Sequence, residues 1–330
     1  MSDAAASALY PACEPYAQGF LPSLQGHQVY FEQTGNPQGL PVLFLHGGPG
    51  SGCTPQHRQL FNPASTRAVL FDQRGCGRSL AQQPLQANTT LDLIGDIERL
   101  RLHLGISSWL VVGGSWGGGL ALAYARVQAQ ACLGLVLRGV FLSRPGDLRW
   151  FFQDAAQCMP DAWSALAQAV PAANREDIGA YLFAQLPAAP DHAALPLAQA
   201  WQDWENALMQ RQFTPRPTAQ PSSSKAPNPT ATAGLLAKYR LQSHYLAQGC
   251  FFPSEGLLQH VSHLPAMPVH LLHGRLDWIC RPESAWALHQ VLSHSRLQWV
   301  DQAGHSLSEP AMSKAMVAAI DAMVTQLKRT

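Results

Sequence analysis

The chain has 330 residues, 47% of them hydrophobic and 13% charged, and a formal net charge of +1. Such a chain can bury a large core, and it lacks the basic surface expected of a nucleic-acid or anionic-lipid binder. No apolar run approaches the roughly 18 residues of a membrane span, and the N-terminus lacks the basic and apolar parts of a signal peptide. Seven scattered cysteines without Cys-x-x-Cys spacing indicate reduced thiols. We therefore expect a cytoplasmic protein that binds neither membrane nor nucleic acid.

Apolar runs typical of strands alternate with helical patterns along much of the chain. Residues 89–104 form one such helical pattern, which starts at Thr89-Thr90 and ends before Gly105. The expected strands are residues 29–31, 42–45, 68–71, 110–112, 133–137, 269–272 and 297–300. This alternation predicts an α/β fold, with a mainly parallel sheet covered by helices on both faces.

The alternation of predicted strands and helices stops after residue 140, where helical patterns rich in aromatic residues replace the strands. We expect a mostly helical cap at residues 144–248, inserted between two parts of the core at 1–143 and 249–330. Within the cap, residues 214–232 are dense in Pro, Ser and Thr, and this composition predicts a mobile loop.

One stretch places a serine among glycines where a predicted strand meets a helix. The sequence there is Gly113-Gly114-Ser115-Trp116-Gly117, and an Ala- and Leu-rich helix follows. A serine on a sharp strand-to-helix turn is typical of the nucleophile elbow of an α/β hydrolase. A phosphate-binding turn is the alternative, but the turn has neither Gly-x-Gly-x-x-Gly nor a closing Lys-Ser or Lys-Thr pair. We predict that Ser115 is the nucleophile.

A serine hydroxyl needs a base to take its proton and a third group to orient that base. In this fold the three residues occur in the order Ser, acid, His. Asp277 and His305 each follow one of the last two predicted strands, so we predict them as acid and base. Asp301 is the alternative acid, although it is too close in sequence to His305 to come from a separate strand end.

Several other polar residues near strand ends are expected to be structural. His46 and His273 each end a predicted strand and should bond to the backbone. Asp72 and Arg74 should fix a turn through an internal ion pair rather than touch a substrate.

A glycine-rich turn, His46-Gly47-Gly48-Pro49-Gly50, follows the strand at 42–45. Glycine lets the backbone approach closely, so an N–H from Gly47 or Gly48 and another from Trp116 can stabilise an oxyanion. The pattern does not decide which glycine donates, and an ordinary Gly/Pro turn is the alternative.

Several segments together match one family. They are 46–50, 72–79, 113–118, 137–141, Trp201-x-x-Trp204-Glu205, 273–277 and Gly304-His305. From about residue 20 to its C-terminus, the chain resembles the proline iminopeptidases, which are prolyl aminopeptidases of the α/β-hydrolase fold. The resemblance implies release of N-terminal proline from small peptides by Ser115, Asp277 and His305, without a metal or other cofactor.

The resemblance also implies residues that bind the substrate. Glu205 would pair with the substrate's α-ammonium, and Phe141, Phe151 and Cys280 would line a pocket for the proline ring. Where the family has a second carboxylate, this chain has Gln242, which accepts a hydrogen bond but carries no charge. Neutral hydrogen bonds are roughly half as strong as charge-assisted ones, so we expect weaker capture of the ammonium.

Two other functions remain open. An esterase or lactonase could use the same triad, and Gln242 favours it if amine recognition has been lost. A catalytically silent binding protein of the same fold is the second, although the ordered Ser, Asp and His argue against it. An epoxide hydrolase or dehalogenase is disfavoured, because those enzymes carry a carboxylate nucleophile at the elbow.

Overall fold

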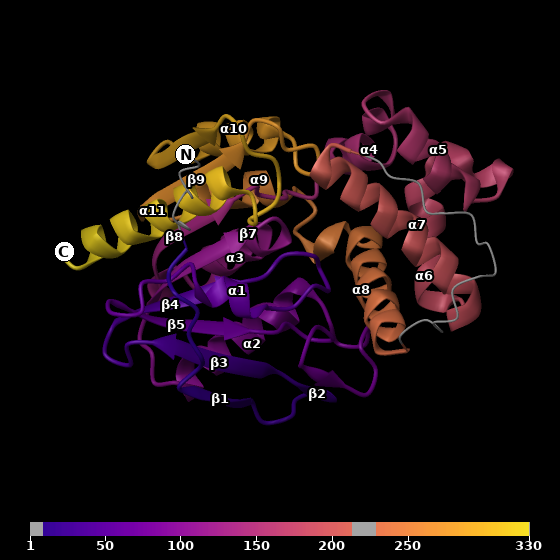
Figure 1. Ribbon diagram of the computed structural model, residues 1–330. Helices are drawn as coiled ribbons and strands as arrows, with labels where there is room; N and C mark the ends of the chain where they lie inside the picture. Colours follow the sequence, from indigo (N-terminus) through magenta and orange to yellow (C-terminus); the bar gives the residue numbers. More distant parts are fainter. Residues whose placement is uncertain (1–8, 213–228, 330) are drawn as a thin grey trace, which may run out of the picture. The chain divides into compact units, whose positions relative to one another are not determined.

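Figure 1 shows a computed structural model, which describes residues 9–212 and 229–329. The chain divides into two compact units, Met1–Leu142 with Phe251–Thr330, and Ser143–Cys250. Every strand of the described residues belongs to the first unit, and the second unit is helical.

The first unit is built on an eight-stranded sheet with the order β1-β3-β5-β4-β7-β8-β9-β10. The strands from β5 to β10 in this order are parallel, whereas β1 and β3 add an antiparallel edge. The strands are β1 (Ala17–Phe20), β3 (Tyr30–Gly35), β4 (Leu40–Leu45), β5 (Thr66–Phe71), β7 (Trp109–Gly114), β8 (Cys132–Arg138), β9 (Val269–Gly274) and β10 (Ser295–Val300), with β2 (His27–Gln28) and β6 (Leu80–Ala81) forming a separate pair. The predicted α/β class and mainly parallel sheet are confirmed.

Both faces of the central strands are buried. Val42 of β4 and Val112 of β7 pack with Ile320 in one core cluster, while the alternate residues Leu43 and Val111 are equally inaccessible. Because neighbouring side chains on a strand point to opposite faces, this pattern requires cover on both sides of the sheet. The helices of this unit are α1 (Pro55–Arg58), α2 (Thr90–His103), α3 (Trp116–Val127), α9 (Leu257–His260), α10 (Pro282–Val291) and α11 (Pro310–Leu327).

Helix α2 begins as its sequence predicts. The Thr89 hydroxyl accepts a hydrogen bond from the backbone N–H of Asp92, and the Asp92 carboxylate accepts one from the backbone N–H of Thr89. This reciprocal capping satisfies N–H groups that a helix start otherwise leaves unpaired.

The turn after β5 is fixed by a different ion pair from the predicted one. Asp72 pairs with Arg78 at 2.8 Å, whereas Arg74 pairs with Asp96 of α2 at 2.5 Å. The conformation of Gly77 accounts for the pairing of Asp72 with Arg78. The φ of Gly77 is +52°, and a Cβ at this position would lie 2.5 Å from Asp72 Oδ2. The chain thus folds back tightly enough for Arg78 to reach Asp72. Burial alone would raise the pKa of Asp72, but the hydrogen bonds from Arg78 lower it below its ordinary value.

The second unit packs around aromatic side chains. The ring centroid of Trp201 lies 5.2 Å from that of Phe152 and 5.1 Å from that of Tyr239. Its helices are α4 (Pro145–Phe152), α5 (Pro160–Gln168), α6 (Ile178–Ala188), α7 (Asp191–Gln210) and α8 (Pro229–Ala247). Most of the predicted loop at 214–232 lies outside the described residues. Residues 229–232 were expected to belong to it but form the start of α8, where a leading proline is compatible with the first helical turn.

All seven cysteines are free thiols. Among the described helices, none combines the length and apolar character needed to cross a bilayer.

Candidate active site

Ser115 occupies a strained turn between β7 and α3. Its φ of 56° and ψ of −125° are unusual for a residue with a side chain. The turn is tight because glycines surround it: a Cβ on Gly113 would lie 2.4 Å from the carbonyl oxygen of Gly117. The serine is partly exposed, and its hydroxyl makes no hydrogen bond within the described part of the chain. This is the geometry of a nucleophile elbow.

The tightness of the elbow gives a stability prediction. A Cβ on Gly117 would lie 2.1 Å from the backbone oxygen of Leu45, whereas a Cβ on Gly95 of α2 would meet nothing within 4 Å. We expect Gly117→Ala to lower the free energy of unfolding by about 3 kcal/mol or more, and Gly95→Ala to raise it by about 0.5–1 kcal/mol. Urea denaturation of both variants measures the difference. Equal effects would contradict this account of the elbow.

Asp277 and His305 form a buried hydrogen-bonded pair. His305 Nδ1 donates to Asp277 Oδ2 at 2.7 Å, while Asp277 Oδ1 accepts from the backbone N–H groups of Ile279 and Cys280 at 3.0 and 2.8 Å. Burial alone would raise the pKa of Asp277, but the neighbouring imidazole and these hydrogen bonds lower it below its ordinary value. Asp277 is therefore a carboxylate that holds the proton on Nδ1, which leaves a lone pair on Nε2 of His305.

The end of β8 connects the serine to this pair. The N–H of Ser115 donates to the Arg138 carbonyl at 2.9 Å, and the N–H of Phe141 donates to the Ser115 carbonyl at 3.2 Å. Between them, a Cβ on Gly139 would lie 3.1 Å from Asp277 Oδ2 and 3.3 Å from His305 Nδ1. The three predicted triad residues therefore all pack against residues 138–141, at the carboxyl edge of the sheet.

Arg138 is a residue whose contribution the sequence analysis missed. Its guanidinium donates to the backbone carbonyl of His305, so it helps to fix the backbone position of the histidine. The only sequence signal was its place in the segment 137–141, which gave no reason to expect that partner.

The glycine-rich turn after β4 approaches the elbow closely. A Cβ on Gly47 would lie 3.4 Å from the Ser115 Cβ and 4.0 Å from its Oγ, whereas a Cβ on Gly48 would meet the backbone N of Gly50 at 2.6 Å. Gly47 therefore lies directly against the Ser115 side chain. Trp116 begins α3, and its indole N–H donates to Gln73 Oε1 at 2.8 Å.

The residues expected to be structural have partners that fit that role. His46 Nε2 accepts from the backbone N–H of Gln73 at 3.0 Å, and His273 Nε2 donates to the Cys280 carbonyl at 2.8 Å. Burial lowers the pKa of both histidines. The side chain of Asp301, the alternative acid, is 83% exposed and lies 3.3 Å from Arg275.

The helical unit contains the residues expected to recognise the amine. Glu205 of α7 is partly buried, and its carboxylate accepts hydrogen bonds from Lys238 at 3.2 Å and from the Tyr239 hydroxyl at 2.7 Å. Gln242 of α8 is buried, and its Oε1 has no hydrogen-bond partner among the described residues. The sequence analysis had no signal for Lys238 or Tyr239 as partners of Glu205.

The predicted pocket residues belong to both units. In the first unit, Cys280 is buried beside Asp277, and Phe141 is partly exposed next to Ser115. In the second unit, Phe151 packs edge-on against Trp204, with ring centroids 6.4 Å apart.

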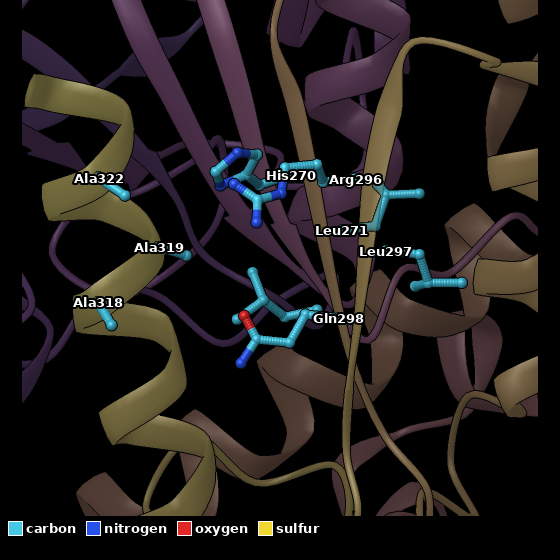
Figure 2. A pocket seen from close by; sticks show the side chains of 9 residues that line it. His270, Leu271, Arg296, Leu297, Gln298, Ala318, Ala319 and Ala322 are labelled. Carbon is cyan, nitrogen blue, oxygen red and sulfur yellow. The ribbon is translucent and has the colours of Figure 1, made fainter. Parts of the chain in front are cut away.

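Neither of two cavities in the first unit indicates where a peptide substrate would bind. One, of about 50 Å³, lies beside Gly47, Gly114 and Arg138 and has room only for water-sized molecules. The other, of about 360 Å³, lies between α11 and the strands β9 and β10, where Figure 2 shows His270, Arg296 and Gln298 facing small alanines. Its lining contains no member of the predicted triad. Among the described residues, no cluster of His, Cys, Asp or Glu could hold a metal ion.

The fold and this constellation define a hydrolase of the α/β-hydrolase class, and the family model for the alpha/beta hydrolase fold matches residues 41–311. The chain is 42% identical to a probable proline iminopeptidase of Leptolyngbya boryana, over 96% of this chain and 97% of the relative. It is also 42% identical to the proline iminopeptidase of Xanthomonas citri, over 95% and 98%. The chain belongs to the proline iminopeptidase family. The crystal structure of a proline iminopeptidase from Mycobacterium smegmatis shares the fold, with a TM-score of 0.59 at 19% identity, over 94% of this chain and 98% of that one.

Proposed function

We propose that this prolyl aminopeptidase works through Ser115 as nucleophile, His305 as general base and Asp277 as the residue that orients His305. The hydrogen bond between Asp277 and His305, at the same sheet edge as the strained Ser115, is the observation that carries the proposal. The substrates would be small peptides with an unblocked N-terminal proline, in keeping with the family to which the chain belongs.

In the proposed mechanism, His305 Nε2 takes the hydroxyl proton as Ser115 Oγ attacks the prolyl carbonyl carbon. The carbonyl oxygen becomes an oxyanion, stabilised by the backbone N–H groups of Trp116 and of Gly47 or Gly48. The closeness of Gly47 to Ser115 favours Gly47 as the second donor. His305 then returns the proton to the departing peptide amine, which breaks the C–N bond, and water hydrolyses the prolyl ester in the same way.

Glu205 is the proposed anchor for the α-ammonium of the substrate, and Gln242 supplies a neutral acceptor. Their partial or full burial supports this role, because a carboxylate shielded from water binds an ammonium more strongly than an exposed one. Phe141, Phe151 and Cys280 are the proposed walls for the proline ring, which is compact and apolar.

A blocked substrate tests this function. We expect prolyl p-nitroanilide to be hydrolysed at least about 100-fold faster, in kcat/KM, than its N-acetylated form, because acetylation removes the charge that Glu205 would bind. Steady-state rates for the two anilides measure the ratio. Similar rates would instead favour an esterase or lactonase that uses the same triad. Rates for an ester substrate would then test that alternative.

A further inference from the structure

The carboxylate proposed to bind the substrate's amine already binds an amine of the protein. Lys238 Nζ lies 3.2 Å from both carboxylate oxygens of Glu205 and 4.7 Å from the centre of the Tyr239 ring. The side chains of Lys238 and Glu205 are only 23% and 16% exposed. A pair with this much burial is screened by solvent less than a pair on the open surface. All these residues belong to the helical unit.

The Lys238 ammonium resembles the substrate's α-ammonium in charge and in its N–H donors. A substrate that binds Glu205 must therefore displace Lys238 or share the carboxylate with it, and either step reduces the gain in binding free energy. Resting on the function proposed above, we infer that Lys238 is an internal competitor for the substrate's amino terminus, and that it sets the affinity for unblocked substrates.

The charge of the anchor supports this inference. Lys238 and Gln242 are four residues apart on α8 and so share one face of that helix. This face of α8 carries one cation, Lys238, and one neutral amide, Gln242. The charges of the Lys238 ammonium and the Glu205 carboxylate therefore cancel. A Glu205 carboxylate already neutralised by Lys238 recognises a second ammonium mainly through short-range hydrogen bonds. Gln242 Oε1, which has no hydrogen-bond partner among the described residues, can accept one of them. Affinity for substrate should then depend only weakly on salt concentration.

The test is to remove the lysine charge. We expect Lys238→Met to lower KM for prolyl p-nitroanilide about five- to tenfold at low salt, with little change in kcat, because the freed carboxylate gains a full charge-assisted bond. KM of the variant should rise with added salt more steeply than KM of the wild type. Lys238→Arg keeps the charge and should behave like the wild type, and Lys238→Gln offers a second neutral variant if the methionine variant folds poorly.

Two controls separate this effect from a change in structure or total charge. Lys314→Met removes an exposed lysine of α11 and should leave KM unchanged. Cyclopentanecarbonyl p-nitroanilide has the ring but no amine, so its KM should not respond to Lys238→Met. An unchanged or higher KM for the prolyl anilide in the neutral variants would overturn the inference.

A binding measurement distinguishes failure of the inference from failure of the proposed function. Prolinamide can be titrated by calorimetry into Ser115→Ala and into Ser115→Ala with Lys238→Met, with no turnover. Tighter binding to the double variant supports the inference, and equal or weaker binding refutes it, whatever the chemistry at Ser115. Absence of prolyl anilide hydrolysis by the wild type would count against the proposed function alone.

Discussion

Replacing Ser115 by alanine is expected to lower kcat for prolyl p-nitroanilide by about 10⁶-fold. The variant has no hydroxyl to form the acyl-enzyme, so only binding and the oxyanion donors remain. The fold should be unaffected, because the hydroxyl makes no hydrogen bond within the described residues and alanine keeps the Cβ that the turn already accommodates. Single-turnover kinetics and thermal unfolding of the variant measure the two effects.

Ser254→Ala is the matched control for this prediction. Ser254 is exposed, and its hydroxyl lies 3.5 Å from the neighbouring Glu255 carboxylate, so its loss should change neither kcat nor stability. An organophosphonate should label the wild type and the control at Ser115 and should leave Ser115→Ala unlabelled. Retention of more than about 1% of the wild-type kcat by Ser115→Ala would remove Ser115 from the proposed role.

The central sheet was predictable because each buried strand carries its own signal. Residues 42–45 and 110–112 are continuous apolar runs, and the structure buries both faces of the strands they form. Strand β1 was missed because Ala17–Phe20 alternates between partly buried and exposed positions without an apolar run. The pairing of β1 with β3 depends on a strand further along the chain, which the four residues of β1 alone do not identify.

Within the active site, residues at strand ends were easier to predict than their partners. Asp277 and His305 could be paired because the carboxyl ends of parallel strands meet at one edge of the sheet. The prediction that Asp72 forms its ion pair with Arg74 was wrong. Whether Arg74 or Arg78 reaches Asp72 depends on the path of a turn through two glycines with positive φ, Gly75 and Gly77.

The hydrogen-bond partners of Glu205 also could not be predicted from sequence. Lys238 and Tyr239 lie 33 and 34 residues from Glu205 along the chain, on a different helix. Their hydrogen bonds depend on how α7 and α8 pack, and helix packing leaves no local pattern that assigns one charged residue to another. Taken alone, a glutamate in a helical pattern indicates a solvated helix face, whereas the structure places Glu205 in a partly buried ion pair.

Asp277→Asn should lower kcat for the prolyl anilide by about 10⁴-fold, as expected when the residue that orients the base loses its charge. The carboxylate accepts the Nδ1 hydrogen of His305 at 2.7 Å, and an amide that turns its NH₂ toward the ring instead favours the tautomer with the proton on Nε2. That tautomer has no lone pair to take the Ser115 proton. Asp301→Asn is the control, because Asp301 is exposed and paired with Arg275, and its kcat should equal that of the wild type.

Comparison of the wild type with Asp277→Asn also tests the electrostatics of Asp277 through acid denaturation. A pKa lowered by folding means that the charged carboxylate stabilises the folded state above its unfolded pKa of about 3.9, and that this contribution is lost as the pH falls through the lower folded-state pKa. The wild type should therefore lose stability relative to Asp277→Asn as the pH falls below about 4. A constant difference in the free energy of unfolding between pH 7 and pH 3, measured by urea denaturation, would show that His305 and the backbone N–H groups do not stabilise the Asp277 charge. The loss of kcat in Asp277→Asn would then need another cause than orientation of the imidazole.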